Sequence, residues 1–160
     1  DVVILLSLFP QVDCVVKAAV TRNPILRVSA GTANYISNRA PDELLDFCVE
    51  RLASGASLLL FPQGTRAIRG EPLKFRLGAA EIALRANATI VPIAIDCNPQ
   101  TLAKNEPWYS IPPSQPRFRI DILPPVAARS LVPEGVEPRR ARHELNAALI
   151  SLIEARLHRA

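Results

Sequence analysis

The residue types best suited to chemistry gather in one short loop that follows an apolar segment. The loop Phe61-Pro62-Gln63-Gly64-Thr65-Arg66 comes directly after the run Ser57-Leu58-Leu59-Leu60, and from Gly64 to Arg76 the chain carries four cations and one acid, a net charge of +3. Gly64 can adopt positive φ and let the backbone approach a ligand. Neighbouring N–H groups and Thr65 can donate to phosphate oxygens, and Arg66 offers a planar fork of donors. The pattern indicates an anion site, although a solvated basic turn would have the same composition.

Histidine, the usual general base near neutral pH, occurs only as His143 and His158. Both lie in a basic, helix-forming segment near the C-terminal end, where we expect surface positions. Their separation gives no standard spacing for a zinc site. Neither residue is a good candidate for a catalytic base or a metal ligand, and we expect the protein to need no metal.

Several short blocks resemble, in order, those of the glycerolipid acyltransferases, the 1-acylglycerol-3-phosphate O-acyltransferase family. Residues 61–66 are similar to the family's Phe-Pro-Glu-Gly-Thr-Arg block, and Phe75-Arg76-Leu77-Gly78-Ala79 is similar to the Phe-Lys-x-Gly-Ala stretch after it. Ile90-Val91-Pro92-Ile93 is similar to the Val-Pro-Ile block, and residues 31–38 occupy the place of the second block. The resemblance covers roughly residues 1–96, and the order of the blocks makes it more specific than any one of them.

This resemblance implies transfer of a fatty acyl group from acyl-CoA or acyl carrier protein to a hydroxyl of a lysophospholipid or related lipid. The family's first block is His-x-x-x-x-Asp, in which the His takes the proton of the acceptor hydroxyl and the Asp orients and charges that His. Asp1, followed by the apolar Val2 to Leu5, fits the Asp of this block, so the His is expected upstream of Asp1. We expect the chain to be a piece of a longer protein and inactive by itself. An ordinary chain end without a role is the alternative for Asp1.

The resemblance also implies that the basic loop binds the acceptor. Arg66 is expected to hold an anionic group, most simply the acceptor's phosphate, and to face the same cleft as Asp1. The residues expected to help Arg66 are Gln63, Gly64, Thr65 and Arg76.

Two positions depart from the family pattern. Gln63 replaces a Glu, so a role that needs negative charge is lost while hydrogen bonding survives. Asn38 stands where the second block often carries an Arg associated with the acceptor phosphate. These departures leave the acceptor open. They also support an alternative function, a non-catalytic lipid- or membrane-binding module that retains the acyltransferase fold.

The elements that must position these residues alternate between strand and helix through the first part of the chain. This alternation predicts an α/β fold, a single domain (residues 1–160) with a mostly parallel central sheet flanked by helices. Ligands of such sheets bind outside the carboxyl ends of the strands, and the loop after Phe61 lies at such an end. Pro92 implies an edge or a bulge in its strand. The expected strands are 12–16, 35–36, 57–61, 89–95 and 118–122, and the expected helices are 2–9, 41–54, 78–88 and 138–158. A strand is the alternative for residues 2–9.

The later part of the chain differs in composition. Residues 99–138 carry nine of the fifteen prolines, which predicts a long irregular excursion interrupted by one strand. Within it, Trp108-Tyr109 either packs against the core or contacts a membrane surface. The arginine-rich C-terminal helix either docks with its basic face in solvent or touches anionic headgroups.

The overall composition bounds the class of protein. Hydrophobic residues make up 49% and charged residues 21% of the 160 residues, which excludes disorder as the dominant state. A net charge of +4 fits an anionic substrate or a lipid surface, and the few aromatic residues predict no nucleic-acid partner. No apolar run approaches the roughly 18 residues of a membrane span. The widely separated Cys14, Cys48 and Cys97 indicate buried thiols in a reducing compartment rather than disulfides.

The expected partners follow from the resemblance. They are an acyl donor thioester, a lipid acceptor with an anionic group, and a membrane surface, with no cofactor beyond acyl-CoA or acyl carrier protein as co-substrate. The resemblance places the protein on the cytoplasmic side of a membrane, held there peripherally or anchored by a segment missing from this chain.

Overall fold

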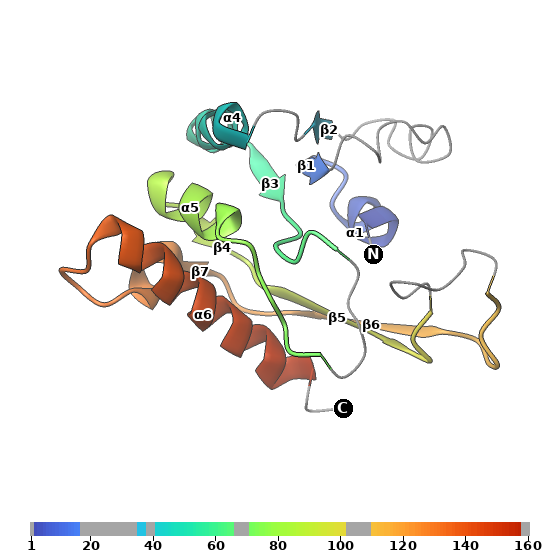
Figure 1. The fold of residues 1–160 in the computed structure, drawn as a ribbon. Coiled ribbons are helices and arrows are strands. Elements are labelled where there is room, and N and C mark those ends of the chain that lie inside the picture. The colour runs from blue at the N-terminus through green and yellow to red at the C-terminus, as the bar shows by residue number, and fades with distance from the viewer. Residues whose placement is uncertain (1, 17–34, 38–40, 66–70, 102–109, 158–160) are drawn as a thin grey trace. The chain divides into compact units, whose positions relative to one another are not determined.

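The chain has an α/β fold, as the alternation of elements predicts. The structure, a computed structural model, describes residues 2–16, 35–37, 41–65, 71–101 and 110–157 (Figure 1). It divides into two compact units, which we describe separately: residues 1–61 with 81–88, and residues 62–80 with 89–160. Within the described residues, no helix combines the length and apolar character needed to cross a bilayer.

The first unit is built on a three-stranded parallel sheet. β1 (Val12–Val16) lies in the centre between β2 (Tyr35–Ser37) and β3 (Ser57–Leu59), and it pairs in parallel with both. These strands confirm three of those expected from the sequence. These three strands form the parallel sheet that the sequence predicts, with fewer strands than expected.

Helices cover both faces of this sheet, and the period of two along the chain decides which residue meets which helix. Leu59 and Phe61 pack in a cluster with residues of α1 (Val2–Leu8). Leu58 and Leu60 pack instead with residues of α4 (Pro41–Ala53) and α5 (Gly78–Arg85). The apolar run therefore divides its side chains between two layers of core.

Two helices, α4 and α5, end where the sequence supplies a residue that tolerates positive φ. Gly55 has φ +88°, and the N–H groups of Gly55 and Ala56 donate to the carbonyls of Leu52 and Arg51, so α4 ends in a Schellman motif. Asn87, with φ +47°, ends the α5 segment in the same way. The expected helix 78–88 therefore stops early, at Arg85, because the chain turns at Asn87.

The second unit contains antiparallel pairs rather than further parallel strands. β4 (Thr89–Ile90) pairs with β7 (Val126–Ala127), and β5 (Ile93–Asn98) pairs with β6 (Arg117–Ile122). The parallel part of the sheet is thus smaller than expected, since the connection after β5 brings β6 back beside it in the opposite direction. The proline-rich segment also holds more regular structure than one strand, because β7 and the 3-10 helix η1 (Ala128–Leu131) follow β6.

Pro92 disturbs its strand more than the edge or bulge expected from the sequence, because it interrupts the strand. β4 ends at Ile90 and β5 begins at Ile93, so the predicted strand 89–95 is interrupted at Val91 and Pro92. The carbonyl of Pro92 accepts a hydrogen bond from the N–H of Leu123, at 2.9 Å. The chain therefore changes its strand partner at the proline, which has no N–H to give to a ladder.

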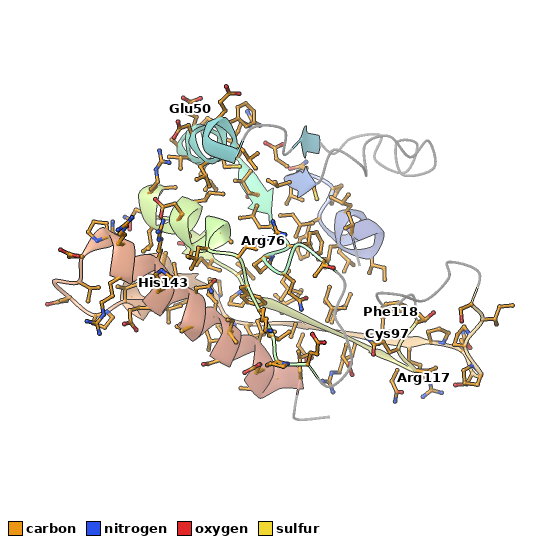
Figure 2. All side chains as sticks on the ribbon, in the orientation of Figure 1. Glu50, Arg76, Cys97, Arg117, Phe118 and His143 are labelled. Carbon is orange, nitrogen blue, oxygen red and sulfur yellow. The ribbon has the colours of Figure 1, made fainter. Side chains whose placement is uncertain are left out.

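α6 (Pro138–Leu157) is the long helix of the second unit and confirms the expected C-terminal helix. It packs against β5 and η1 through Ala141, Leu145 and Leu149, all buried at helical spacing. Leu145 is fully buried, and burying a leucine stabilises a fold by about 2–3 kcal/mol. His143 is exposed on α6, as expected (Figure 2).

The cysteines are free thiols, as their spacing predicts. Cys14 and Cys48 are fully buried and Cys97 is partly buried. Burial raises the pKa of Cys14 from 9.0 to about 11. Burial and, to a smaller extent, the negative charge of Asp13 raise the pKa of Cys48.

The raised pKa of Cys14 predicts a loss of stability in alkali. In the unfolded chain this thiol ionises near pH 9, whereas in the folded chain it ionises only near pH 11. Its contribution to stability is therefore complete below pH 9 and lost as the pH rises to about 11, a change on the order of 2 kcal/mol. Urea unfolding at pH 8 and pH 10.5 measures it. Cys14→Ala should flatten the pH dependence, and an equally steep dependence in that variant would contradict this origin.

Candidate anion site on the loop after the third strand

The candidate site begins where the chain leaves β3. Pro62 and Gln63 form a turn, and Gly64 follows with φ +62°, in the left-handed region that favours glycine. The N–H of Arg76 donates to the carbonyl of Pro62 at 2.8 Å. This hydrogen bond joins the turn to the segment that carries Arg76, although Pro62 and Arg76 lie more than ten residues apart in the sequence.

The side chain of Arg76 lies directly over Gly64. A Cβ placed on Gly64 would be only 3.0 Å from Nε of Arg76 and 3.3 Å from its Cδ. Figure 2 shows Arg76 beside the loop, and its side chain is exposed. Among the residues that the structure describes, no carboxylate forms an ion pair with Arg76.

Four of the six residues expected at the site lie within the described residues, and among these the side chain of Arg76 lies over Gly64. Gln63 and Gly64 are partly buried, whereas Thr65 and Arg76 are exposed. Asp1 and Arg66 lie outside the described residues, so the cleft that they were expected to share stays a prediction. The other expectations that fall outside the described residues concern Asn38, Trp108, Tyr109 and His158.

This arrangement can bind an oxyanion by charge and hydrogen bonding. The Arg76 guanidinium supplies a planar set of donors, and the hydroxyl of Thr65 supplies another donor on the same loop. Within the described ranges, no group of three or more His, Cys, Asp or Glu residues could hold a metal ion. The chemistry that these residues support is recognition of a phosphate or carboxylate.

Gly64→Ala should weaken anion binding about tenfold, because the new methyl group would press against the side chain of Arg76 and displace it. A left-handed alanine also costs about 1–2 kcal/mol of stability. Titration with inorganic phosphate, followed by NMR of the loop amides, measures the affinity. Gly135→Ala is the matched control, since Gly135 has φ +74° but no atom within 4 Å of an added Cβ. Gly135→Ala should lose stability from backbone strain but keep its affinity for phosphate. Equal losses of affinity in the two variants would contradict the role of Gly64.

Two sets of polar contacts were not predicted from the sequence. Asp13, only 5% exposed on β1, accepts a hydrogen bond from Nε of Arg51 on α4 at 2.7 Å. Asn146 and Glu154 of α6 hydrogen-bond to the backbone near Arg76. The single available signal was a polar residue within an otherwise apolar strand or helical stripe, and such a signal does not identify its partner.

Comparison with known proteins identifies the family. A family model described as Acyltransferase matches residues 1–96. Human 1-acyl-sn-glycerol-3-phosphate acyltransferase alpha is 32% identical over 96 residues, which are 59% of this chain and 32% of that protein. A Chlamydomonas reinhardtii 1-acyl-sn-glycerol-3-phosphate acyltransferase is 36% identical over 62 residues, which are 39% of this chain and 19% of that protein. The chain thus spans about a third or less of the curated relatives it matches.

A solved structure shares the fold. The crystal structure of the 1-acyl-sn-glycerophosphate acyltransferase PlsC from Thermotoga maritima aligns with a TM-score of 0.60 at 19% identity, covering 89% of this chain and 57% of that one. The family match includes the turn at Gly64 and the segment that carries Arg76. By sequence and by fold, the chain therefore belongs to the glycerolipid acyltransferase family.

Proposed function

We propose that the protein to which this chain belongs transfers a fatty acyl group from a thioester donor to the free hydroxyl of an anionic lysophospholipid. The observation that carries the proposal is the exposed guanidinium of Arg76 over Gly64, without an ion-pair partner among the described residues and within the region of the family match. The donor is acyl-CoA or acyl carrier protein. Lysophosphatidate is the first acceptor to test, because the relatives are named for acylating a glycerol 3-phosphate lipid.

The proposed reaction needs a base for the acceptor and a site for its phosphate. A His upstream of Asp1 takes the proton of the acceptor hydroxyl while that oxygen attacks the thioester carbonyl, and Asp1 orients and charges the His. The C–S bond breaks as the ester C–O bond forms, and the His returns the proton to the departing thiolate. Arg66 and Arg76, with Thr65 and the Gly64 backbone, bind the acceptor phosphate and so bring the hydroxyl to the base.

The protein is proposed to work at the cytoplasmic surface of a membrane, where its lipid acceptor resides. The net charge of +4 supports attraction to anionic headgroups. No cofactor is needed beyond the donor, since the thioester itself is activated and the His–Asp pair moves the proton.

The second candidate function is a lipid-binding module without catalysis. Gln63 favours it, because an amide stands where the family block has a carboxylate. Such a module would bind anionic lipids through the same loop but would leave the thioester intact.

The experiment that tests the proposal is an acyl-transfer assay on the protein extended upstream to include the His. We expect transfer from acyl-CoA or acyl carrier protein to lysophosphatidate, much slower transfer to neutral monoacylglycerol, and no transfer by residues 1–160 alone. Arg66→Ala should raise KM for lysophosphatidate about 100-fold, because a charged hydrogen bond to the phosphate is lost. Activity that survives replacement of both the His and Arg66 would overturn the assignment, and vesicle binding without transfer would support the binding module.

A further inference from the structure

The peptide group between Phe75 and Arg76 is held from both sides. Its N–H, which belongs to Arg76, donates to the carbonyl of Pro62 at 2.8 Å. Its carbonyl, which belongs to Phe75, accepts a hydrogen bond from Nδ2 of Asn146 at 3.3 Å. The orientation of a peptide plane sets the direction in which the next side chain leaves the backbone. These two contacts therefore determine where the side chain of Arg76 begins.

A second contact with α6 holds the same segment two residues before Phe75. The N–H of Leu73 donates to Oε1 of Glu154 at 3.3 Å. Asn146 and Glu154 are two helical turns apart on α6, and both side chains hydrogen-bond to the segment from Leu73 to Phe75, so they share one side of the helix. The backbone from Leu73 to Arg76 is thus attached to the helix at two points.

α6 is itself well fixed in the second unit. Leu145, the neighbour of Asn146, is fully buried, and Leu149 is buried one turn later. Asn146 is partly buried, so its amide has few alternative partners in solvent. A side chain fixed in this way can hold a backbone group in one orientation, here together with the hydrogen bond to Pro62.

We infer that Asn146 is a positioning residue for Arg76: by holding the carbonyl of Phe75, and with help from Glu154, it keeps the guanidinium of Arg76 over Gly64. The inference adds a residue of α6, near the other end of the chain, to a candidate site that otherwise lies within residues 1–96, the range of the family match. Its catalytic meaning rests on the proposed function, because Arg76 is proposed there to bind the acceptor phosphate.

The experiment replaces Asn146 in the protein extended upstream and measures three quantities. Asn146→Asp preserves the shape, but its carboxylate cannot donate to the Phe75 carbonyl. We expect KM for lysophosphatidate to rise about tenfold with kcat and the KM for the donor nearly unchanged. The affinity for inorganic phosphate should fall by the same factor, and hydrogen exchange at the Arg76 amide should quicken about tenfold.

Two further variants separate positioning from general damage. Asn146→Gln keeps a donor amide on a longer side chain and should restore part of the acceptor affinity and of the protection at Arg76. Ser151→Ala, at an exposed position on the same helix, should leave all three quantities unchanged. Exchange and phosphate affinity that stay normal in Asn146→Asp, or a loss that Asn146→Gln and Ser151→Ala share equally, would overturn the inference.

The readouts also distinguish this inference from the proposed function. If the unaltered protein transfers no acyl group, the proposed function fails, yet faster exchange at Arg76 and weaker phosphate binding in Asn146→Asp would still support the positioning role. If the unaltered protein is active and Asn146→Asp leaves acceptor KM and exchange unchanged, the positioning role fails alone.

Discussion

Asp1→Asn, made in the protein extended upstream to include the His, should lower kcat by roughly 10³- to 10⁴-fold, the size of effect seen when the aspartate of a catalytic triad is amidated. The amide keeps the shape of the side chain but cannot stabilise the imidazolium that forms when the His takes a proton. It also favours the wrong tautomer, since it can donate to the ring nitrogen that should carry the proton. Steady-state kinetics with saturating donor and acceptor measures the change.

Asp13→Asn is the matched control for this experiment. Asp13 is the buried carboxylate of β1, and its partner is Arg51. We expect the Asn variant to lose stability while the folded protein keeps nearly normal kcat, the reverse of the result at Asp1. A normal kcat in Asp1→Asn, or a loss of kcat at Asp13 as large as that at Asp1, would show that the catalytic carboxylate is assigned to the wrong residue.

Arg51→Met should lower the free energy of unfolding by about 2–3 kcal/mol, the largest expected effect on stability. The methionine replaces the aliphatic part of the side chain but leaves the carboxylate of Asp13, whose side chain is 7% exposed, without its cation. The expected loss is below that for a fully buried pair because the Arg51 side chain is 37% exposed and water screens it. Urea unfolding at pH 7 measures the loss.

The double variant Asp13→Leu with Arg51→Met tests whether the lone charge is the cause. Removing both charged groups eliminates the desolvation penalty that the single variant leaves behind, so the double variant should recover most of the lost stability. A double variant as unstable as Arg51→Met would contradict the explanation and point to packing around α4 instead.

Elements with a strong local signal could be predicted from the sequence. The boundaries of α4 follow from Pro41 at its start and Gly55 at its end, and Gly55 indeed has positive φ. A disturbance at Pro92 could be predicted from the missing N–H of proline, although the sequence indicated an edge or a bulge and the structure has a break. The early end of α5 could not be predicted as easily, because asparagine at position 87 takes a left-handed conformation less regularly than glycine.

Contacts between distant residues were beyond sequence reasoning. Asp13 and Arg51 are 38 residues apart, and Asn146 and Phe75 are 71 apart, so neither pair follows from helical or strand periodicity. The antiparallel return of β6 beside β5 was missed for the same reason, since a long connection does not determine strand direction. At the site, a joint role of Gly64 and Arg76 is predicted from residue type and family resemblance, and the structure adds that the side chain of Arg76 lies 3.0 Å from the position that a Cβ on Gly64 would take.

The order of strands in the first unit bears on how the protein is made. β1 needs both β2 and β3 as neighbours, and β3 lies more than forty residues later in the chain. A ribosome therefore releases β1 long before its second partner emerges, and pairing between distant parallel strands is slow. During that interval the exposed strand edge can join another nascent chain, so we expect synthesis of this protein to depend on chaperones that shield the edge until Leu59 has emerged.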